Sequence, residues 1–550
     1  MTASHSGKSL ANHILRAGAA VGIANLLFKL AGLFQARAMG QYLEPGTYDV
    51  VYAFAFENCI FAIYLIGEEV IGPAALPIFM RELDKHGEKS AWSFANVVLT
   101  LQFVLLVAVI ALLMVFPGWI IRFLTLGTWS LASRGESFAL AAWSVRRLAP
   151  ALIGLSLGSM TYVILNGYKR FFLAAFGDAV WKFTVVVVLV LFVTGPSNAA
   201  QFLIWGLLAG SVLKLVTHLA GLHDKILLMR PSFDLYNPAL KRMLWLALPL
   251  LVGIVFAKFR DLANSVLILS ELDTEGLMQA NSMGRKLQNT LHWMVPYTLS
   301  IAVFPFFCEL VDQSDHERLG SVITRVGRQL LAIFIPFVAV VAVLAVPLTG
   351  LIFGGGHFDD LAIRRTALSM ACYTFALPAA AVEAIVMQAF FANRRMVATT
   401  VIGIVFSAFS VLVSWLGLRY GGGREMLLLA AVAGGFALSR ILKSFTLVNL
   451  LNRSTPVFPV RATAGFLLRV VLASALSAAA AWLASTQALG LAGNAGLAER
   501  LTDLLRLAAG GAAAVAVLLA AFRLLRVDEP YELIRLVSQK RHRTPPGGKA

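Results

Sequence analysis

The chain has 550 residues, of which 59% are apolar and 14% are charged, and its formal net charge is +17. Soluble domains carry about 25% charged residues, so the composition predicts an integral membrane protein. In such a protein the basic excess is first of all a topology signal and does not by itself indicate a nucleic-acid partner. The three cysteines, Cys59, Cys308 and Cys372, stand far apart, which argues against a disulfide framework or a structural zinc site.

The apolar segments predict an all-α polytopic membrane protein with 14 transmembrane helices, because each crossing needs about 20 apolar residues. The first apolar stretch carries Lys29 and Arg37 and lacks a small-residue cleavage site, so we expect a retained span and not a signal peptide. No connection is long or polar enough for a separate soluble domain. In chain order the predicted spans are 11–38, 48–72, 92–116, 147–167, 171–195, 199–222, 243–268, 276–308, 325–352, 363–392, 396–418, 426–451, 463–486 and 502–524.

Lysine and arginine are shared unevenly between alternate loops. One set of loops is basic throughout, with Arg81, Lys169, Arg394 and Arg453 among its residues, whereas segments 195–199 and 270–276 of the other set contain no basic residue. Basic loops face the cytoplasm. With an even number of spans, both termini are then expected to be cytoplasmic.

Landmarks of the first half recur in the second half at a nearly constant offset. Lys29 and Lys258 are 229 positions apart, and Pro77 and Pro305 are 228 apart. Transporters are often built from two related helix bundles with a cavity between them that opens alternately to either side. We therefore expect two pseudo-symmetric six-helix lobes plus two C-terminal helices: residues 1–222 (N-lobe, spans 1–6), 223–452 (C-lobe, spans 7–12), 453–526 (spans 13–14) and a basic cytoplasmic tail, 527–550.

Ionisable residues inside the predicted spans are the candidate functional residues. An ionisable group at bilayer depth costs about 2.5–3.5 kcal/mol on insertion scales and usually faces a wet cavity or a partner. Basic residues dominate the set, which predicts a cationic central cavity, and arginine in particular suits a phosphate group. The set is Lys29, Arg37, Glu57, Lys182, Lys258, Arg260, Asp261, Arg285, Lys286 and Glu383.

Several of these charges have a second interpretation. Arg37 can also lie at the span end and reach the headgroups, and Lys258, Arg260 and Asp261 can neutralise one another. Arg285 and Lys286 are adjacent, so one helix face cannot present both. Glu57, Asp261 and Glu383 are candidates either for binding a coupling ion or for pairing with the bases.

The sequence contains no catalytic constellation. There is no GxxxxGK[ST] phosphate loop and no metal-ligand spacing, and the glycine-rich segment at Gly354 follows a helix and is typical of a turn. We therefore expect a transporter that is not an enzyme and uses neither cofactor nor metal.

Six segments, taken in order, resemble a known family. They are "FKLAGLFQARAMG" from Phe28, "YDVVYAFAF" from Tyr48, "GEEVIGPAALPIF" from Gly67, "RRLAPALIGLSLGSMTYVILNGYKRF" from Arg146, "MGRKLQ" from Met283 and "LIFGGGHFDD" from Leu351. Their order and the span count are similar to those of the MurJ/MviN lipid II flippases of the multidrug/oligosaccharidyl-lipid/polysaccharide exporter superfamily. The resemblance implies a multi-pass protein of the bacterial cytoplasmic (inner) membrane that acts in peptidoglycan synthesis.

The resemblance also suggests residue roles. Lys29 and Arg37 stand at or near two cavity arginines of the family's first helix, Asp49 matches an aspartate early in its second helix, Arg285 matches a cavity arginine of its eighth helix, and Glu68 matches an acidic turn. The implied diphosphate contacts are Lys29, Arg37 and Arg285. Two departures stand out: lysine replaces arginine at position 29, and spans 11 and 12 lack the carboxylates of the sodium site known in some members.

Three functions remain open at this point. The first is a flippase that moves a polyprenyl-diphosphate-linked saccharide, lipid II or an exopolysaccharide or O-antigen repeat unit, to the outer leaflet by alternating access. Its substrate-binding residues would be Lys29, Arg37, Asp49, Lys258, Arg260 and Arg285. The second is a drug or cation antiporter of the same superfamily, and the third is a membrane scaffold for the cell-envelope synthesis machinery, its basic tail recruiting anionic lipid.

Overall fold

The protein is described here from a computed structural model that covers residues 27–126, 135–292, 298–393, 395–495, 498–529 and 531. Within these residues the structure is helical, and the β pairing is limited to one isolated bridge between Gly355 and Phe358. Eleven helical segments are long and apolar enough to cross a membrane, and a pair bent by 45° raises the number to 12. The expected all-α, multi-pass class is therefore confirmed.

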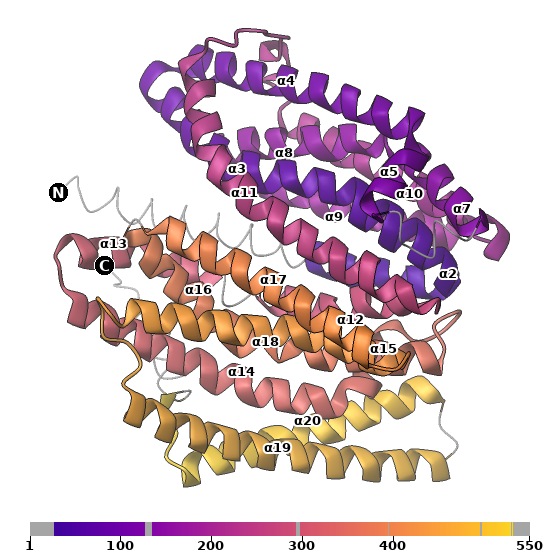
Figure 1. Cartoon of the computed structure of the whole chain (residues 1–550), viewed down its shortest axis with the longest axis vertical. Coiled ribbons are helices and arrows are strands. Elements are labelled where there is room, and N and C mark those ends of the chain that lie inside the picture. Colours follow the sequence, from indigo (N-terminus) through magenta and orange to yellow (C-terminus); the bar gives the residue numbers. More distant parts are fainter. Residues whose placement is uncertain are drawn as a thin grey trace, which may run out of the picture. The chain divides into compact units, whose positions relative to one another are not determined.

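The chain divides into two compact units, Met1–Gln279 with Phe353–Asp359, and Ala280–Ile352 with Asp360–Ala550. In the first unit, helix 27–42 is followed, within the described residues, by thirteen further helices, whose α-helical members are labelled in Figure 1. They are α2 (Pro45–Thr47), the π-helix η1 (Tyr48–Ile60), α3 (Phe61–His86), α4 (Glu88–Val115), α5 (Pro117–Leu124), α7 (Gly135–Leu148), α8 (Ala151–Gly167), α9 (Phe171–Phe192), α10 (Pro196–Gly221), η2 (Ile226–Leu228), α11 (Pro238–Leu262), η3 (Ala263–Ile268) and η4 (Leu269–Leu272).

Small residues let the helices of the first unit approach closely. A Cβ at Gly154 of α8 would lie 2.3 Å from the carbonyl oxygen of Ser211 on α10, and one at Gly210 would lie 2.6 Å from the carbonyl oxygen of Trp181 on α9. Close backbone contact of this kind is the usual means of helix association in lipid, where apolar burial alone gives no preference. The three helices α8, α9 and α10 consequently form a tight group that carries the buried charges described below.

The second unit begins inside α12 and consists of α12 (Leu277–His292), α13 (Thr298–Asp312), α14 (His316–Phe353), α15 (Asp360–Thr374), α16 (Ala376–Ala392), α17 (Met396–Tyr420), α18 (Glu425–Leu451), α19 (Val460–Asn494) and α20 (Glu499–Leu524). Its main apolar core joins α13, α14, α16 and α18. The last two helices, α19 and α20, lie side by side and pack on α14 through Phe466, Phe522 and Ala332.

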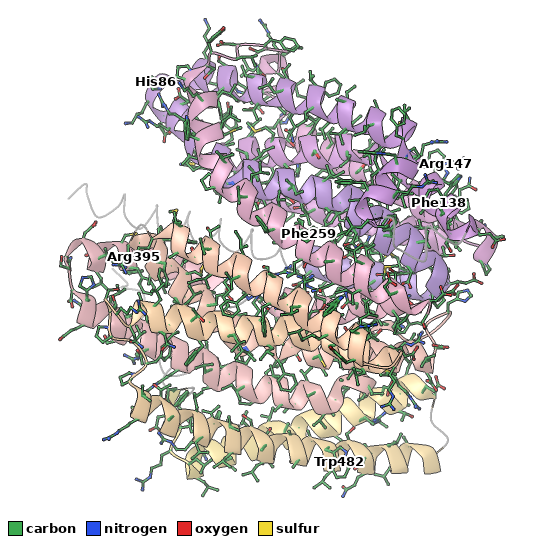
Figure 2. The ribbon with its side chains drawn as sticks, in the orientation of Figure 1. His86, Phe138, Arg147, Phe259, Arg395 and Trp482 are labelled. Carbon is green, nitrogen blue, oxygen red and sulfur yellow. The ribbon has the colours of Figure 1, made fainter. Side chains whose placement is uncertain are left out.

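Large apolar side chains remain exposed on many helices. Trp482 on the outer side of α19 is 56% exposed, and Phe259 of α11 is 53% exposed (Figure 2). A soluble monomer rarely exposes large contiguous apolar surface, whereas lipid tails accept it. The exposed side chains therefore agree with the membrane assignment that the helix lengths gave.

Three predicted spans either differ from the helices of the structure or are only partly described. The expected span 276–308 covers α12 and α13, and residues 293–297 between them lie outside the described residues. The second predicted span extends from 48–72 to Pro45–His86, since its Pro73 and Pro77 do not end the helix. Of the first predicted span, 11–38, only 27–38 is described, as part of helix 27–42, and most of the expected basic tail, 527–550, lies outside the described residues.

Candidate substrate site

Two lysines of the first unit meet at one aromatic ring. Nζ of Lys29, on helix 27–42, lies 5.3 Å from the centroid of the Phe28 ring, and Nζ of Lys182, on α9, lies 3.6 Å from it. Gly32 leaves room for the second lysine, because a Cβ there would lie 3.0 Å from Nζ of Lys182. Aromatic faces attract cations within about 6 Å. The first helix thus presents its lysine beside a second cation contributed by α9.

Two further predicted residues are half-buried in the same unit. Arg37 follows Lys29 by two helical turns, which places it about 12 Å further along the axis. Glu57 lies on η1, the π-helix that leads into α3. Segments with π-helical hydrogen bonding are rare and often occur at functional sites.

Asp49 is buried and bonded to backbone. Its Oδ2 accepts a hydrogen bond from the amide of Gly276 at 2.7 Å, and its Oδ1 accepts one from the amide of Gln279 at 2.8 Å. Gly276 directly precedes α12 and Gln279 lies in its first turn, where the N–H groups have no partner within the helix. Asp49 therefore acts as a cap that fixes the start of α12.

The two predicted bases of α11 have carboxylate partners. Nζ of Lys258 lies 3.2 Å from Oε1 of Glu69 on α3, and Nη2 of Arg260 lies 2.7 Å from Oδ1 of the adjacent Asp261. The alternative interpretation had Lys258, Arg260 and Asp261 neutralising one another. In the structure Arg260 pairs with Asp261, whereas Lys258 pairs with Glu69 of α3. Pairing offsets the cost of holding charge at membrane depth, and it ties α11 to α3.

In the second unit, Arg285 of α12 lies among aromatic rings. Its Cζ is 5.0 Å from the centroid of Phe436 on α18 and 5.9 Å from that of Tyr373 on α15. The hydroxyl of Tyr373 donates to Oδ1 of Asn281, one turn before Arg285, at 2.7 Å. The guanidinium thus lies within cation–π distance of two rings, which help to position it while it stays half-buried.

Glu383 of α16 lies in a cluster of charges with α18. Nη1 of Arg440 lies 2.8 and 3.0 Å from its two carboxylate oxygens, and Nζ of Lys443 lies 2.8 Å from Oε1. The carboxylate is 8% exposed. Of the two roles open to Glu383, the structure shows charge pairing, and it pairs with two cations that the sequence analysis did not select.

A second buried cluster lies within α3, α9 and α10. Lys214, whose side chain is 1% exposed, has its Nζ 2.6 Å from Oδ1 of Asp178 and donates to the hydroxyl of Tyr64 at 2.8 Å. The same hydroxyl is hydrogen-bonded to Glu68. One turn further along α10, Nδ1 of His218 lies 3.0 Å from Oγ1 of Thr161. Lys214 is therefore surrounded by polar partners.

Sequence reasoning missed Asp178, Lys214, Arg440 and Lys443. All four lie inside predicted spans, and Arg440 and Lys443 lie one turn apart on the same helix, α18. One signal was available, since Lys214 and Lys443 are 229 positions apart, the same offset as the pair Lys29 and Lys258. The described residues contain no group of three or more His, Cys, Asp or Glu side chains placed to hold a metal ion.

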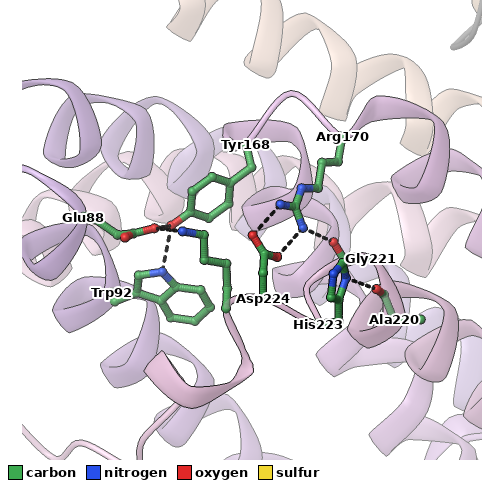
Figure 3. A network of polar contacts seen from close by, with 9 residues as sticks. Glu88, Trp92, Tyr168, Arg170, Ala220, Gly221, His223 and Asp224 are labelled. Atoms are coloured by element: carbon green, nitrogen blue, oxygen red, sulfur yellow. Dashed lines mark hydrogen bonds and ion pairs between the residues drawn. The ribbon is translucent and has the colours of Figure 1, made fainter.

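Outside the spans, the turns that follow α8 and α10 are joined by a polar network (Figure 3). Arg170 pairs with Asp224 at 2.6 Å, and this hydrogen-bonded contact lowers the pKa of Asp224 to about 2. Lys225 pairs with Glu88 at 2.6 Å, and the hydroxyl of Tyr168 also donates to Glu88. Burial, and then the bond to Glu88, raises the pKa of Tyr168. Arg170 and Lys225 thus fasten the loop that follows α10 to the start of α9 and to the start of α4.

Comparison with known proteins gives a consistent result. The sequence model of the family described as "Lipid II flippase MurJ" matches residues 39–494. A lipid II flippase MurJ of Burkholderia cenocepacia is 22% identical over 373 residues, which are 67% of this chain and 71% of that protein.

Solved structures of the same fold include "Lipid II flippase MurJ, inward closed conformation", with a TM-score of 0.70, 17% identity, and coverage of 92% of this chain and 99% of that one. An inward-facing MATE transporter of the MOP superfamily has a TM-score of 0.65 at 13% identity, covering 79% of this chain and 98% of that one. An outward-facing one has a TM-score of 0.57 at 14% identity, covering 80% and 94%.

The family model matches well over half of the chain, and the relative and the fold agree with it. The predicted family is therefore confirmed, and with it a transporter and not an enzyme. The chain belongs to the MurJ lipid II flippase family.

Proposed function

We propose that this protein translocates lipid II, a polyprenyl-diphosphate-linked peptidoglycan precursor, from the cytoplasmic to the outer leaflet of the bacterial inner membrane. The observation that carries the proposal is the family match over residues 39–494, which includes Arg285 of α12 and begins directly after the segment with Lys29 and Arg37. A headgroup with a diphosphate needs cations at membrane depth. Lys29, Arg37 and Arg285 are half-buried cations of this kind, on helix 27–42 and on α12.

The diphosphate contacts in this proposal are Lys29, Arg37 and Arg285, which line a cationic central cavity. Lys258 and Arg260 have Glu69 and Asp261 as partners, and Asp49 holds the start of α12. In this proposal Lys258 and Arg260 shape the cavity wall, and Asp49 positions Arg285 by holding the start of α12. Glu57, Asp261 and Glu383 are assigned to charge pairing or to coupling.

The proposed architecture has 14 spans with both termini in the cytoplasm. Two lobes, 1–222 and 223–452, would alternate between inward- and outward-open states, with the helices of 453–526 and the basic tail, 527–550, appended. Alternating access is supported by the fold likeness to MATE transporters solved in inward-facing and outward-facing conformations. Such a transporter would work beside the cell-envelope synthesis machinery.

A second substrate is favoured by one observation: lysine stands at position 29, where the family has arginine. Lysine is a point charge and arginine a planar fork, so the two hold a diphosphate differently. An exopolysaccharide or O-antigen repeat unit on the same lipid carrier would keep the diphosphate and change the sugar. A drug or cation antiporter fits less well, because the candidate site is mainly basic.

Genetic replacement separates these substrates. In a bacterium depleted of its own lipid II flippase, this chain is expected to restore growth, and the Arg285→Ala variant is expected not to restore it at equal membrane abundance. Rescue of O-antigen export in a strain lacking that flippase, with no rescue of growth, would favour the second substrate. Failure of the wild-type chain in both strains would refute a lipid-linked saccharide.

A further inference from the structure

Glu383, Arg440 and Lys443 hold more positive than negative charge inside the membrane. Arg440 and Lys443 share the one carboxylate of Glu383, and no other carboxylate among the described residues forms an ion pair with either. Arg440 lies fifteen residues after the start of α18, or about 22 Å along its axis, and about 16 Å from its end. The surplus charge therefore lies near the middle of a span, where an uncompensated cation is costly.

The two cations also keep donors available. One nitrogen of Arg440, Nη1, makes both contacts with Glu383, so Nε and Nη2 remain for other acceptors. The ammonium of Lys443 uses one of its three hydrogens on Glu383. The side chains of Arg440 and Lys443 are 27% and 14% exposed, so a ligand can reach them. Cζ of Arg440 lies 5.4 Å from the centroid of Phe436, the ring that also contacts Arg285.

The first unit provides an internal comparison. Lys214 lies 229 positions before Lys443 and is also buried on the sixth helix of its repeat. There, however, Asp178 at 2.6 Å and Glu68, through Tyr64, supply two carboxylates for one cation. The equivalent position of the second unit has two cations for one carboxylate. Equivalent places in the two repeats therefore differ in the sign of their surplus charge.

We propose that Arg440 and Lys443, oriented by Glu383 and Phe436, form an anion subsite that binds a phosphate group of the lipid-linked substrate. This inference rests on the proposed function and adds residues to it. Paired guanidinium and ammonium donors suit phosphate oxygens, and a bound phosphate would supply the negative charge that the cluster lacks. Glu383 holds the two side chains in place in the absence of substrate. Arg285 also contacts the Phe436 ring, with its Cζ 5.0 Å from the centroid, and would extend the subsite.

The test measures binding of farnesyl diphosphate, farnesyl monophosphate and inorganic pyrophosphate to the full-length protein in detergent. Lys443→Met removes the surplus cation and leaves Glu383 and Arg440 paired one to one. We expect about tenfold weaker binding of farnesyl diphosphate, near-normal binding in Lys443→Arg, and no change in Arg453→Met, which removes an exposed cation just beyond α18. The melting temperature without ligand should not fall.

A second variant should act in the opposite direction. Glu383→Gln raises the surplus charge and should tighten diphosphate binding, which a purely structural role of the cluster would not produce. Equal loss for pyrophosphate and farnesyl diphosphate in Lys443→Met would support the diphosphate as the recognised group. Unchanged binding in Lys443→Met, or an equal loss in Arg453→Met, would overturn the subsite. If that result came with normal lipid II translocation by the wild type, the proposed function would stand; absence of translocation would refute the function itself.

Discussion

The pair between Lys214 and Asp178 allows a quantitative test of how the first unit tolerates buried charge. Asp178→Asn removes the carboxylate 2.6 Å from Nζ of Lys214 and leaves the ammonium in a position where the side chain is 1% exposed. The asparagine keeps the volume of the side chain, so the packing of α9 against α10 is unchanged. The perturbation is therefore almost purely electrostatic.

Its size follows from what remains around Lys214. Breaking a buried ion pair by removing one partner costs about 3–5 kcal/mol. The hydroxyl of Tyr64, at 2.8 Å, and the nearby Glu68 still stabilise the ammonium. We therefore expect the lower end of the range, about 3 kcal/mol. Replacing both partners, in Asp178→Asn with Lys214→Met, leaves no buried cation and should cost less than the two single changes added together.

The measurement is the free energy of unfolding of the four proteins of this double-mutant cycle in lipid bicelles. A favourable coupling energy of about 2–3 kcal/mol is expected for contacting charges in one network. Costs that add without coupling would show that Lys214 draws its stability from elsewhere. A single Asp178→Asn variant as stable as the wild type would refute the reasoning about buried charge in this unit.

Four further outcomes follow from the described contacts. Gly154→Ala places a Cβ 2.3 Å from a backbone oxygen of α10 and should lower the unfolding free energy by about 1–3 kcal/mol. Asp49→Ala should lower it by about 0.5–2 kcal/mol. Asp49→Asn keeps only one of the two acceptor oxygens that Asp49 uses, so it should lose less stability than Asp49→Ala and retain transport; loss of transport in folded Asp49→Asn would point to a role for its charge. The stability that Asp224 gains from Arg170 should be fully present above the unfolded pKa of about 4 and should be lost as the pH falls through about 2. It is measured as the difference in unfolding free energy between the wild type and Asp224→Asn. A difference that does not change with pH would contradict this prediction. Arg285→Ala should reduce lipid II translocation at least about tenfold with an unchanged helical circular dichroism spectrum, and translocation at the wild-type rate would exclude a substrate contact.

Much of the fold could be predicted because hydropathy reports directly on membrane spans. Most predicted spans coincide with helices of the structure, including the long apolar α14 and α18. Hydropathy grouped the polar α12 with the apolar α13 in one predicted span, 276–308. A helix such as α12 is held by specific contacts, among them the cap from Asp49, which lies more than 200 positions away in sequence.

The candidate site was less accessible to prediction, because a sequence shows where charges stand and not what they contact. Lys258 was selected as a candidate intramembrane cation, but its partner on α3 could not be read from α11 alone. Lys214 and Lys443 were missed although each lies inside a predicted span. Only the packing of α9 on α10 and of α16 on α18 brings carboxylates to them.

The most direct test is lipid II translocation by the purified full-length chain in proteoliposomes. Fluorescently labelled lipid II is placed in the inner leaflet, where a membrane-impermeant quencher cannot reach it. Translocation is then measured as the loss of this protection, for the wild type and for Arg285→Ala. We expect rapid loss of protection with the wild type and a rate close to protein-free vesicles with Arg285→Ala. A wild-type protein that is folded, correctly inserted and no faster than protein-free vesicles would contradict a lipid II flippase.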